Sequence, residues 1–327
     1  MPRTVAMFEG VYPLIKDRLD ALGLDIDVIT FDADGRFGPD RLAPGEMRLD
    51  YLWFSSRQGK LGMKQPDAFA MALACQHVGV LQTYNAGLDD PFYARMAANG
   101  TRLSNSSAQG VAIAEYVIGQ VMSVLQPIAL QRQQQAEKRW RITPFREISQ
   151  TNWLIVGFGP IGTAIAKRVK AFEAGVMAVR RSPVPDRNVD RMGTATDLVE
   201  MLAEADVVVL ACPLNDATRG LAGPDFFAAL KPGAILINIA RGGVVDDAAL
   251  LAALENGTVE TAILDVFGAE PLPEDDPYWT HPKVRLTPHT SFAGDGGTGR
   301  WDQLFLDNIA RFMRGERLIR EVDPGDL

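Results

Sequence analysis

The sequence predicts an α/β protein of two domains, each built on a mainly parallel β-sheet. The chain has 327 residues, which is the length expected for about two domains. Short apolar runs alternate with helix-like segments over the first hundred residues, and a second alternating series starts near residue 152. Strands separated by helices are typical of βαβ units, and such units form parallel sheets.

The first series contains four predicted strands, at residues 4–8, 27–31, 51–54 and 78–83. A helix is expected over residues 12–22, where apolar side chains recur on one face. Ligands of parallel sheets bind beyond the carboxyl ends of the strands. The loop of residues 84–89, which follows the fourth strand, is therefore a candidate binding loop.

The second series contains six predicted strands with helices between them, which fits a complete Rossmann domain. These strands lie at residues 153–156, 176–179, 207–211, 234–239, 261–264 and 283–286. A final helix is expected over residues 302–313, with no strand pair after it. We expect this helix to pack back on the first domain.

Composition excludes several classes of function. The net charge is −8, and such an acidic chain is poorly suited to bind nucleic acid or an anionic membrane. Cys75 and Cys212 are expected to be reduced, buried thiols, and no Cys–His cluster has the spacing of metal ligands.

The N-terminus is too short in apolar length for a signal peptide. Residues 111–130 are apolar but interrupted by polar residues, so they predict a buried helix that bends or ends near Pro127. The expected location is cytoplasmic.

A glycine-rich loop provides the first functional motif. Gly157, Gly159 and Gly162 match G-x-G-x-x-G directly after a predicted strand and open a predicted helix. The glycines permit a tight turn, close approach of a pyrophosphate and close helix packing, and the helix N-terminus attracts phosphate. The predicted dinucleotide site therefore comprises Gly157, Gly159, Pro160, Ile161 and Gly162, with a purely structural turn as the alternative. A second match at residues 294–299 lacks a following strand, and we interpret it as a flexible connection at a domain boundary.

The end of the second Rossmann strand indicates which nicotinamide cofactor is used. NAD-binding domains place a carboxylate there to hold the ribose 2′-hydroxyl. This chain instead has Arg180, Arg181 and Ser182. Arginine binds phosphate bidentately, so the sequence favours NADP(H). NAD(H) is possible if the arginines are solvated surface charges.

Five segments resemble the D-isomer-specific 2-hydroxyacid dehydrogenase family, which includes glyoxylate/hydroxypyruvate reductases and phosphoglycerate dehydrogenases. The segments are residues 156–165 (VGFGPIGTAI), 213–220 (PLNDATRG), 237–250 (INIARGGVVDDAAL), 264–272 (LDVFGAEPL) and 286–289 (LTPH). The resemblance covers nearly the whole chain, and the motifs together are specific.

The resemblance assigns three residues to hydride transfer. It implies that Arg241 binds the substrate carboxylate and polarises the carbonyl, and that His289 donates the proton. Glu270 would hydrogen-bond the other ring nitrogen of His289 and fix its tautomer. Taken singly, the three could be a surface charge, a turn residue and a loop histidine. The implied substrate contacts also include the backbone N–H groups of Ala86 and Gly87, and the implied cofactor contacts include Pro213, Thr218, Ala240 and Asp265, the last facing the nicotinamide carboxamide.

The resemblance also implies the domain arrangement. A Rossmann domain of residues 103–291 would be inserted into a flavodoxin-like substrate domain of residues 1–102 and 292–327, and the chain would form a homodimer. Trp140 lies in a region that family members use for dimer contacts, although a local core or surface role is an equal alternative. Arg57 is a candidate for holding a second anionic group, and Phe292 departs from the family pattern and could narrow the pocket. Glu at 270 argues against the formate-oxidising relatives, which have Gln.

The predicted function is NADPH-linked reduction of a small 2-oxo acid of the glyoxylate or hydroxypyruvate type to a D-2-hydroxy acid. One alternative is an NAD-linked D-2-hydroxyacid dehydrogenase such as a relative of phosphoglycerate dehydrogenase. The paired arginines count against that alternative. Another is a cofactor-sensing protein that acts like a corepressor, which the complete Arg–Glu–His set disfavours.

Overall fold

The computed structural model describes residues 2–323 and residue 325, and the chain divides into two compact units. The first unit comprises Met1–Ala108 and Asp295–Leu327, and the second comprises Gln109–Gly294. The first unit extends past the expected boundary at residue 102 because Arg102–Ser104 forms a strand of its sheet. The chain returns to this unit at Asp295 rather than at residue 292.

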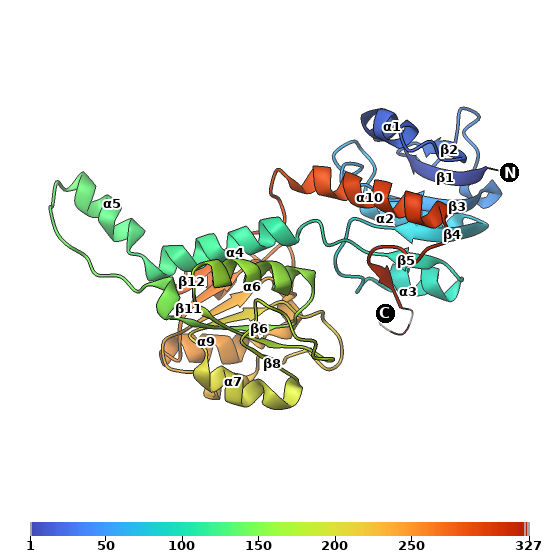
Figure 1. Cartoon of the computed structure of the whole chain (residues 1–327). Helices are drawn as coiled ribbons and strands as arrows, with labels where there is room; N and C mark the ends of the chain where they lie inside the picture. The colour runs from blue at the N-terminus through green and yellow to red at the C-terminus, as the bar shows by residue number, and fades with distance from the viewer. Residues whose placement is uncertain (1, 324, 326–327) are drawn as a thin grey trace. The chain divides into compact units, whose positions relative to one another are not determined.

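The first unit is built on a six-stranded sheet with the order β13-β5-β4-β3-β1-β2 (Figure 1). All of its strand pairs are parallel except β13 with β5, which is antiparallel. The short strands β5 and β13 were not predicted, because runs of two or three residues carry no periodicity. The bounds are β1 Arg3–Phe8, β2 Ile26–Phe31, β3 Arg48–Trp53, β4 His77–Gln82, β5 Arg102–Ser104 and β13 Glu321–Val322.

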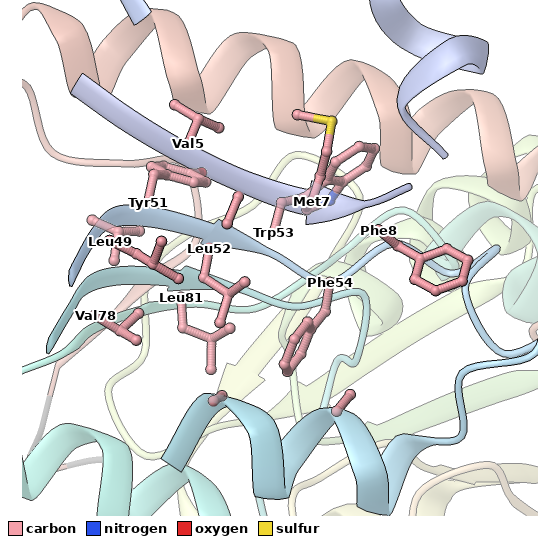
Figure 2. Packing of buried hydrophobic residues seen from close by; sticks show 14 of the residues in the cluster. Val5, Met7, Phe8, Leu49, Tyr51, Leu52, Trp53, Phe54, Val78 and Leu81 are labelled. Carbon is pink, nitrogen blue, oxygen red and sulfur yellow. The ribbon is translucent and has the colours of Figure 1, made fainter. Parts of the chain in front are cut away.

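Helices cover both faces of the first sheet. Successive side chains of β3 point to opposite faces, so Tyr51 and Trp53 lie toward α10 while Phe54, just after β3, lies toward α2 (Figure 2). Trp53 stacks on Phe305 of α10 with ring centroids 4.0 Å apart, and this contact confirms that the final helix packs on the first domain. The helices are α1 Tyr12–Asp20, α2 Gln65–Ala74, α3 Pro91–Ala98 and α10 Gly297–Met313.

Helix α10 begins earlier than expected, inside the second glycine-rich match. Gly297–Gly299 forms its first turn, so this part is helix rather than a flexible connection. A Cβ on Gly297 would lie 2.8 Å from the Trp301 ring. Close packing on Trp301 therefore explains a glycine at this helix start.

The second unit is built on a seven-stranded, wholly parallel sheet with the order β12-β11-β10-β9-β6-β7-β8. This is the Rossmann order, and the direction of winding reverses between β6 and β9. The three-residue strand β8 was not predicted. The strands are β6 Asn152–Val156, β7 Gly175–Val179, β8 Arg191–Gly193, β9 Val207–Leu210, β10 Ala234–Asn238, β11 Val259–Leu264 and β12 Val284–Leu286.

The second unit also contains helices, which with the exception of α5 pack on the two faces of its sheet. They are α4 Gly110–Leu125, α5 Ile128–Ala136, α6 Pro160–Ala171, α7 Leu198–Glu204, α8 Pro224–Ala228 and α9 Asp247–Glu255. Short 3-10 turns in the two units lie at Pro44–Glu46, Ile148–Gln150, Ala195–Asp197, Gly242–Val244 and Pro277–Trp279.

The apolar stretch that begins near residue 111 forms two helices. Ile113, Val117 and Val121 of α4 are buried against α6 and the sheet. The chain bends by 57° at the break before α5. Among the described residues no single helix is long and apolar enough to cross a membrane. Of the described helices, only α4 and α5 taken together reach the required length and apolar composition, and the chain is bent between them. The prediction of a buried helix that ends near Pro127 is confirmed for α4, whereas α5 extends away from the sheet of its unit (Figure 1).

Both cysteines are free thiols. Cys212 is buried, as expected, but Cys75 is only half-buried. Burial raises the pKa of Cys75 to about 12 and that of Cys212 to about 11. Both therefore stay protonated near neutral pH and are unsuited to nucleophilic chemistry.

Candidate active site

The glycine loop between β6 and α6 is shaped by two close contacts and one open position. Gly157 has a φ of +97°, and a Cβ there would lie 2.5 Å from the Cys212 nitrogen. A Cβ on Gly162 would lie 2.6 Å from the Gly157 oxygen. No atom lies within 4 Å of the position of a Cβ on Gly159, so its glycine is not explained by packing within the protein. Open space here fits the close approach of a ligand.

The N-terminus of α6 is available to an anion. Gly159 is the N-cap residue and Pro160 is the first helical residue, and no side chain caps this end. The first N–H groups of a helix have no intrahelical partner and carry a partial positive charge. The glycine loop and the helix start therefore fit the pyrophosphate of a dinucleotide.

The residues directly after β7 include two arginines and no carboxylate. Arg180 is half-buried, and Arg181 and Ser182 are exposed. The first carboxylate after β7 is Asp186, which accepts hydrogen bonds within its own turn. These residues fit a 2′-phosphate better than a free ribose hydroxyl pair.

Thr218 closes its own loop. Its hydroxyl donates to the Pro213 carbonyl at 2.6 Å and accepts from the Asn215 N–H at 2.9 Å. These bonds give Thr218 a structural role within its own loop. A cofactor contact for Thr218 or Pro213 stays a prediction.

Arg241 lies three residues after the end of β10, in a turn that the buried side chain of Asn238 stabilises with two hydrogen bonds. The Asn238 amide accepts from the Ala240 N–H at 3.0 Å and donates to the Arg241 carbonyl at 3.0 Å. The Arg241 guanidinium donates to the Ala240 carbonyl at 2.8 Å. Sequence reasoning missed Asn238, although a polar residue in an otherwise apolar strand was a usable signal.

The Arg241 turn packs tightly against the segment that follows β11. A Cβ on Gly242 would lie 1.9 Å from the Phe267 carbonyl carbon, so only glycine fits there. The Phe267 N–H in turn donates to Glu270 Oε1 at 3.0 Å. The turn after β10 thus contacts the segment that leads to Glu270.

The structure brings Glu270 and His289 together. Glu270 Oε2 lies 2.8 Å from His289 Nδ1, while Oε1 accepts from the Phe267 N–H. The His289 and Glu270 side chains are 42% and 37% exposed in this chain. Because Nδ1 is occupied by the carboxylate, Nε2 is the ring nitrogen that can reach a substrate.

Asp265 lies at the end of β11 and is 1% exposed. Its carboxylate accepts hydrogen bonds from residues on both sides of His289, whose φ is +47°. Contact with a nicotinamide carboxamide stays a prediction, since no described contact of Asp265 tests it.

The expected carboxylate-binding loop belongs to the first unit. Two carbonyls of this loop accept side-chain hydrogen bonds. Trp301 donates to the Tyr84 carbonyl at 3.1 Å, and Asn105 donates to the Ala86 carbonyl at 2.6 Å. Among the described residues, the N–H groups of Ala86 and Gly87 have no acceptor. Adjacent unpaired N–H groups suit an anion.

Comparison with known proteins places the chain in a family. Residues 118–291 match the model of the D-isomer specific 2-hydroxyacid dehydrogenase, NAD binding domain. The chain belongs to the D-isomer specific 2-hydroxyacid dehydrogenase family. This membership and the two parallel sheets confirm the predicted fold class.

Three proteins illustrate the similarity. A glyoxylate/hydroxypyruvate reductase B of Citrobacter koseri is 30% identical over 83% of this chain and 86% of its own length. A glyoxylate reductase/hydroxypyruvate reductase of Homo sapiens is 35% identical, and the match spans 54% of each chain. The crystal structure of a family member from Xanthobacter autotrophicus Py2, in complex with NADPH and MES, has a TM-score of 0.79 at 28% identity and covers 99% of both chains.

Three other residues considered in the sequence have distinct surroundings in this dehydrogenase. Arg57 Nη2 pairs with Asp302 at 2.6 Å, so part of its charge is already matched. The Phe292 ring meets the His289 ring edge-on, with centroids 6.1 Å apart. Trp140 is fully exposed, so a local core role for it is wrong.

Proposed function

We propose that this dehydrogenase reduces a small 2-oxo acid of the glyoxylate or hydroxypyruvate type to the D-2-hydroxy acid, with NADPH preferred over NADH. The contact of 2.8 Å between Glu270 and His289 carries the proposal. Arg241, Glu270 and His289 follow β10, β11 and β12, which are adjacent parallel strands. The carboxyl ends of such strands meet at one edge of the sheet, where ligands of this fold bind.

The residues divide the reaction between them. The Arg241 guanidinium binds the substrate carboxylate and polarises the carbonyl. His289 Nε2 gives its proton to the carbonyl oxygen as negative charge develops there. Glu270 stabilises the protonated ring and keeps Nε2 directed toward the substrate. The reduced nicotinamide, when bound, supplies the hydride for the carbonyl carbon. Hydride and proton together convert the 2-oxo acid into the 2-hydroxy acid.

The preference for NADPH is supported by the segment after β7. It presents Arg180 and Arg181 and lacks the carboxylate that would hold a ribose 2′-hydroxyl. The structural relative from Xanthobacter autotrophicus binds NADPH.

The direct test is the initial rate of NADPH and NADH oxidation with glyoxylate, hydroxypyruvate, pyruvate and phenylpyruvate. We expect fast turnover with NADPH and one of the first two acids. His289→Ala should lower kcat about 10²- to 10⁴-fold, the usual contribution of a general acid. Tight NADPH binding without turnover of any 2-oxo acid would instead support a sensing role.

The cofactor preference has its own test. Arg180→Ala combined with Arg181→Ala should raise the KM for NADPH about 10- to 100-fold, the value of one or two charge-assisted hydrogen bonds. The KM for NADH should stay the same. Arg187→Ala is a matched control, because Arg187 is an exposed arginine of the same segment. Equal effects on the two cofactors would remove the assignment of the arginine pair to the 2′-phosphate.

We also propose that the chain forms a homodimer through its arm, which we define as residues 127–147. Trp140, Ile142 and Phe145 of the arm are exposed by 103%, 88% and 54%. Large apolar side chains gathered on an exposed segment mark an interaction surface. The family resemblance also implies dimerisation. We therefore propose that a second copy of this chain covers the apolar side chains of the arm.

A further inference from the structure

We infer that Asp265 is a positioning residue that holds the loop of His289 in its observed backbone conformation, and that through His289 it acts on the proton-transfer step. The inference rests on the proposed role of His289 as proton donor.

The loop of His289 needs a restraint. His289 has a φ of +47°, in the left-handed region that side chains other than glycine rarely adopt. Its N–H donates to the Thr287 carbonyl at 2.9 Å, which closes a very tight turn. Such a conformation persists only where the surrounding structure determines it.

Asp265 supplies the restraint from both sides of His289. Before the histidine, the Thr287 hydroxyl donates to Asp265 Oδ1 at 2.6 Å. After it, the Thr290 N–H donates to Oδ1 at 2.8 Å, and the Ser291 N–H donates to Oδ2 at 3.0 Å and to Oδ1 at 3.2 Å. Three donors that flank His289 in the sequence therefore converge on one carboxylate.

Asp265 is itself fixed to the sheet. Its N–H donates to the Asn238 carbonyl at 3.0 Å, and its side chain is buried. Thr287 is fixed further by the Tyr116 hydroxyl, 2.7 Å from its own. Because the single hydroxyl proton of Thr287 goes to Asp265, Tyr116 must be the donor in that pair. The loop is thus connected to both the sheet and α4.

A carboxylate is the group that this site requires. Every polar group that the structure places against its oxygens is a donor, and an ionised aspartate accepts at both oxygens. An asparagine has nearly the same shape but would direct its NH₂ group at one of these donors. Asp265→Asn should therefore loosen the loop without removing volume from the site.

The decisive experiment compares Asp265→Asn with wild type in the full chain. Displacing a reacting group by about 1 Å costs about 10²-fold in rate, so we expect kcat to fall by about that factor. The KM for NADPH should change much less than kcat, because the glycine loop and the α6 N-terminus are untouched. Asp206→Asn is the matched control, since Asp206 accepts a backbone N–H in the same unit but at the amino end of β9. It should leave kcat unchanged.

A second readout does not depend on turnover. The chain has three histidines, so imidazole ¹H–¹⁵N spectra can be assigned by the loss of signals in His289→Ala. Asp265→Asn should shift the Nδ1 signal of His289 as its contact with Glu270 weakens, while His77 and His281 keep their signals. Asp206→Asn should leave all three unchanged.

Opposite results would overturn the inference. A raised KM for NADPH with an unchanged kcat would make Asp265 a cofactor contact, and an unchanged His289 spectrum in Asp265→Asn would exclude the positioning role. If Asp265→Asn does not fold, Thr287→Val removes one of the three donors to Asp265, together with the acceptor for Tyr116, and should lower kcat in the same direction but by less. If the wild type reduces no 2-oxo acid, the proposed function fails, and the histidine spectra still decide whether Asp265 positions the loop.

Discussion

At the residue scale, the site depends on one strained residue and one shared carboxylate. The left-handed conformation of His289 costs about 1–3 kcal/mol, and this cost is met by contacts outside the histidine. Glu270 divides its two oxygens between the His289 ring and the Phe267 N–H. The ring orientation therefore depends on both partners of Glu270 at once.

Glu270→Gln tests this sharing. An amide has one acceptor oxygen, so it satisfies either the Phe267 N–H or a protonated His289 Nδ1, but not both. We expect kcat to fall about 10²-fold, at the lower end of general acid–base contributions, with cofactor affinity unchanged. Steady-state kinetics and a cofactor titration measure the two quantities. Wild-type kcat in this variant would show that the carboxylate does not act on the histidine.

At the element scale, the two edges of the second sheet carry different kinds of residue. The carboxyl ends of β6, β10, β11 and β12 lead to the candidate site residues, whereas a charge cluster joins the amino ends of β6, β9 and β10. Asp206, just before β9, accepts from the Asn152 N–H at 2.8 Å and contacts Lys231 and Arg146 at 3.0 Å each. Burial of this carboxyl opposes its ionisation, but the three donors outweigh burial and lower its pKa.

The lowered pKa of Asp206 predicts how stability depends on pH. The folded state binds this proton less tightly than the unfolded chain, so the contribution is complete above the unfolded pKa of about 4 and is lost as pH falls through the folded value. Asp206→Asn should lower the free energy of unfolding at pH 7 by about 1–3 kcal/mol, the value of hydrogen bonds to a charged group. Urea unfolding at pH 7 and at lower pH measures the difference. A gap between wild type and variant that widens on acidification would contradict the assignment.

At the scale of the whole molecule, the arm is the feature that the fold of one chain leaves unexplained. A tryptophan and an isoleucine that are almost wholly exposed contribute nothing to the core of their own unit. Their burial by a second copy would account for their exposure here.

Trp140→Ala combined with Ile142→Ala should weaken self-association. Truncating a buried aromatic anchor costs about 2 kcal/mol or more, which raises the dimer Kd about 30-fold. Sedimentation velocity over a range of concentrations measures this change. Trp279→Ala is the control, because Trp279 is half-exposed but lies outside the arm. A wild-type chain that is monomeric at every concentration would refute the proposed dimer.

Much of the fold could be predicted from sequence, because the long strands and the glycine loop have strong local signals. Both parallel sheets, the helix that returns to Trp53 and the break near Pro127 follow from periodicity and from proline and glycine. The strands β5, β8 and β13 could not be predicted, since their pairing partners, not their own residues, make them strands.

The site was predictable in composition but not in its supporting contacts. The motifs indicated Arg241, Glu270 and His289 as separate loop residues, and the structure adds the 2.8 Å contact between the last two. Nothing in the sequence reveals the positive φ of His289 or the convergence of three donors on Asp265, because both depend on the path of the backbone. Asn238 belongs to the same group: its clamp on the Arg241 turn is visible only in three dimensions.

The interruption of the first unit by the second has a consequence for biosynthesis. Residues 109–294 leave the ribosome as one continuous stretch, so the Rossmann unit has all of its residues while translation is still under way. The N-terminal part of the first unit must wait, because Phe305, which stacks on Trp53, and the edge strand β13 are translated only after the second unit. The N-terminal sheet is therefore the later of the two to be completed, and until α10 is made the face that carries Trp53 lacks its covering helix.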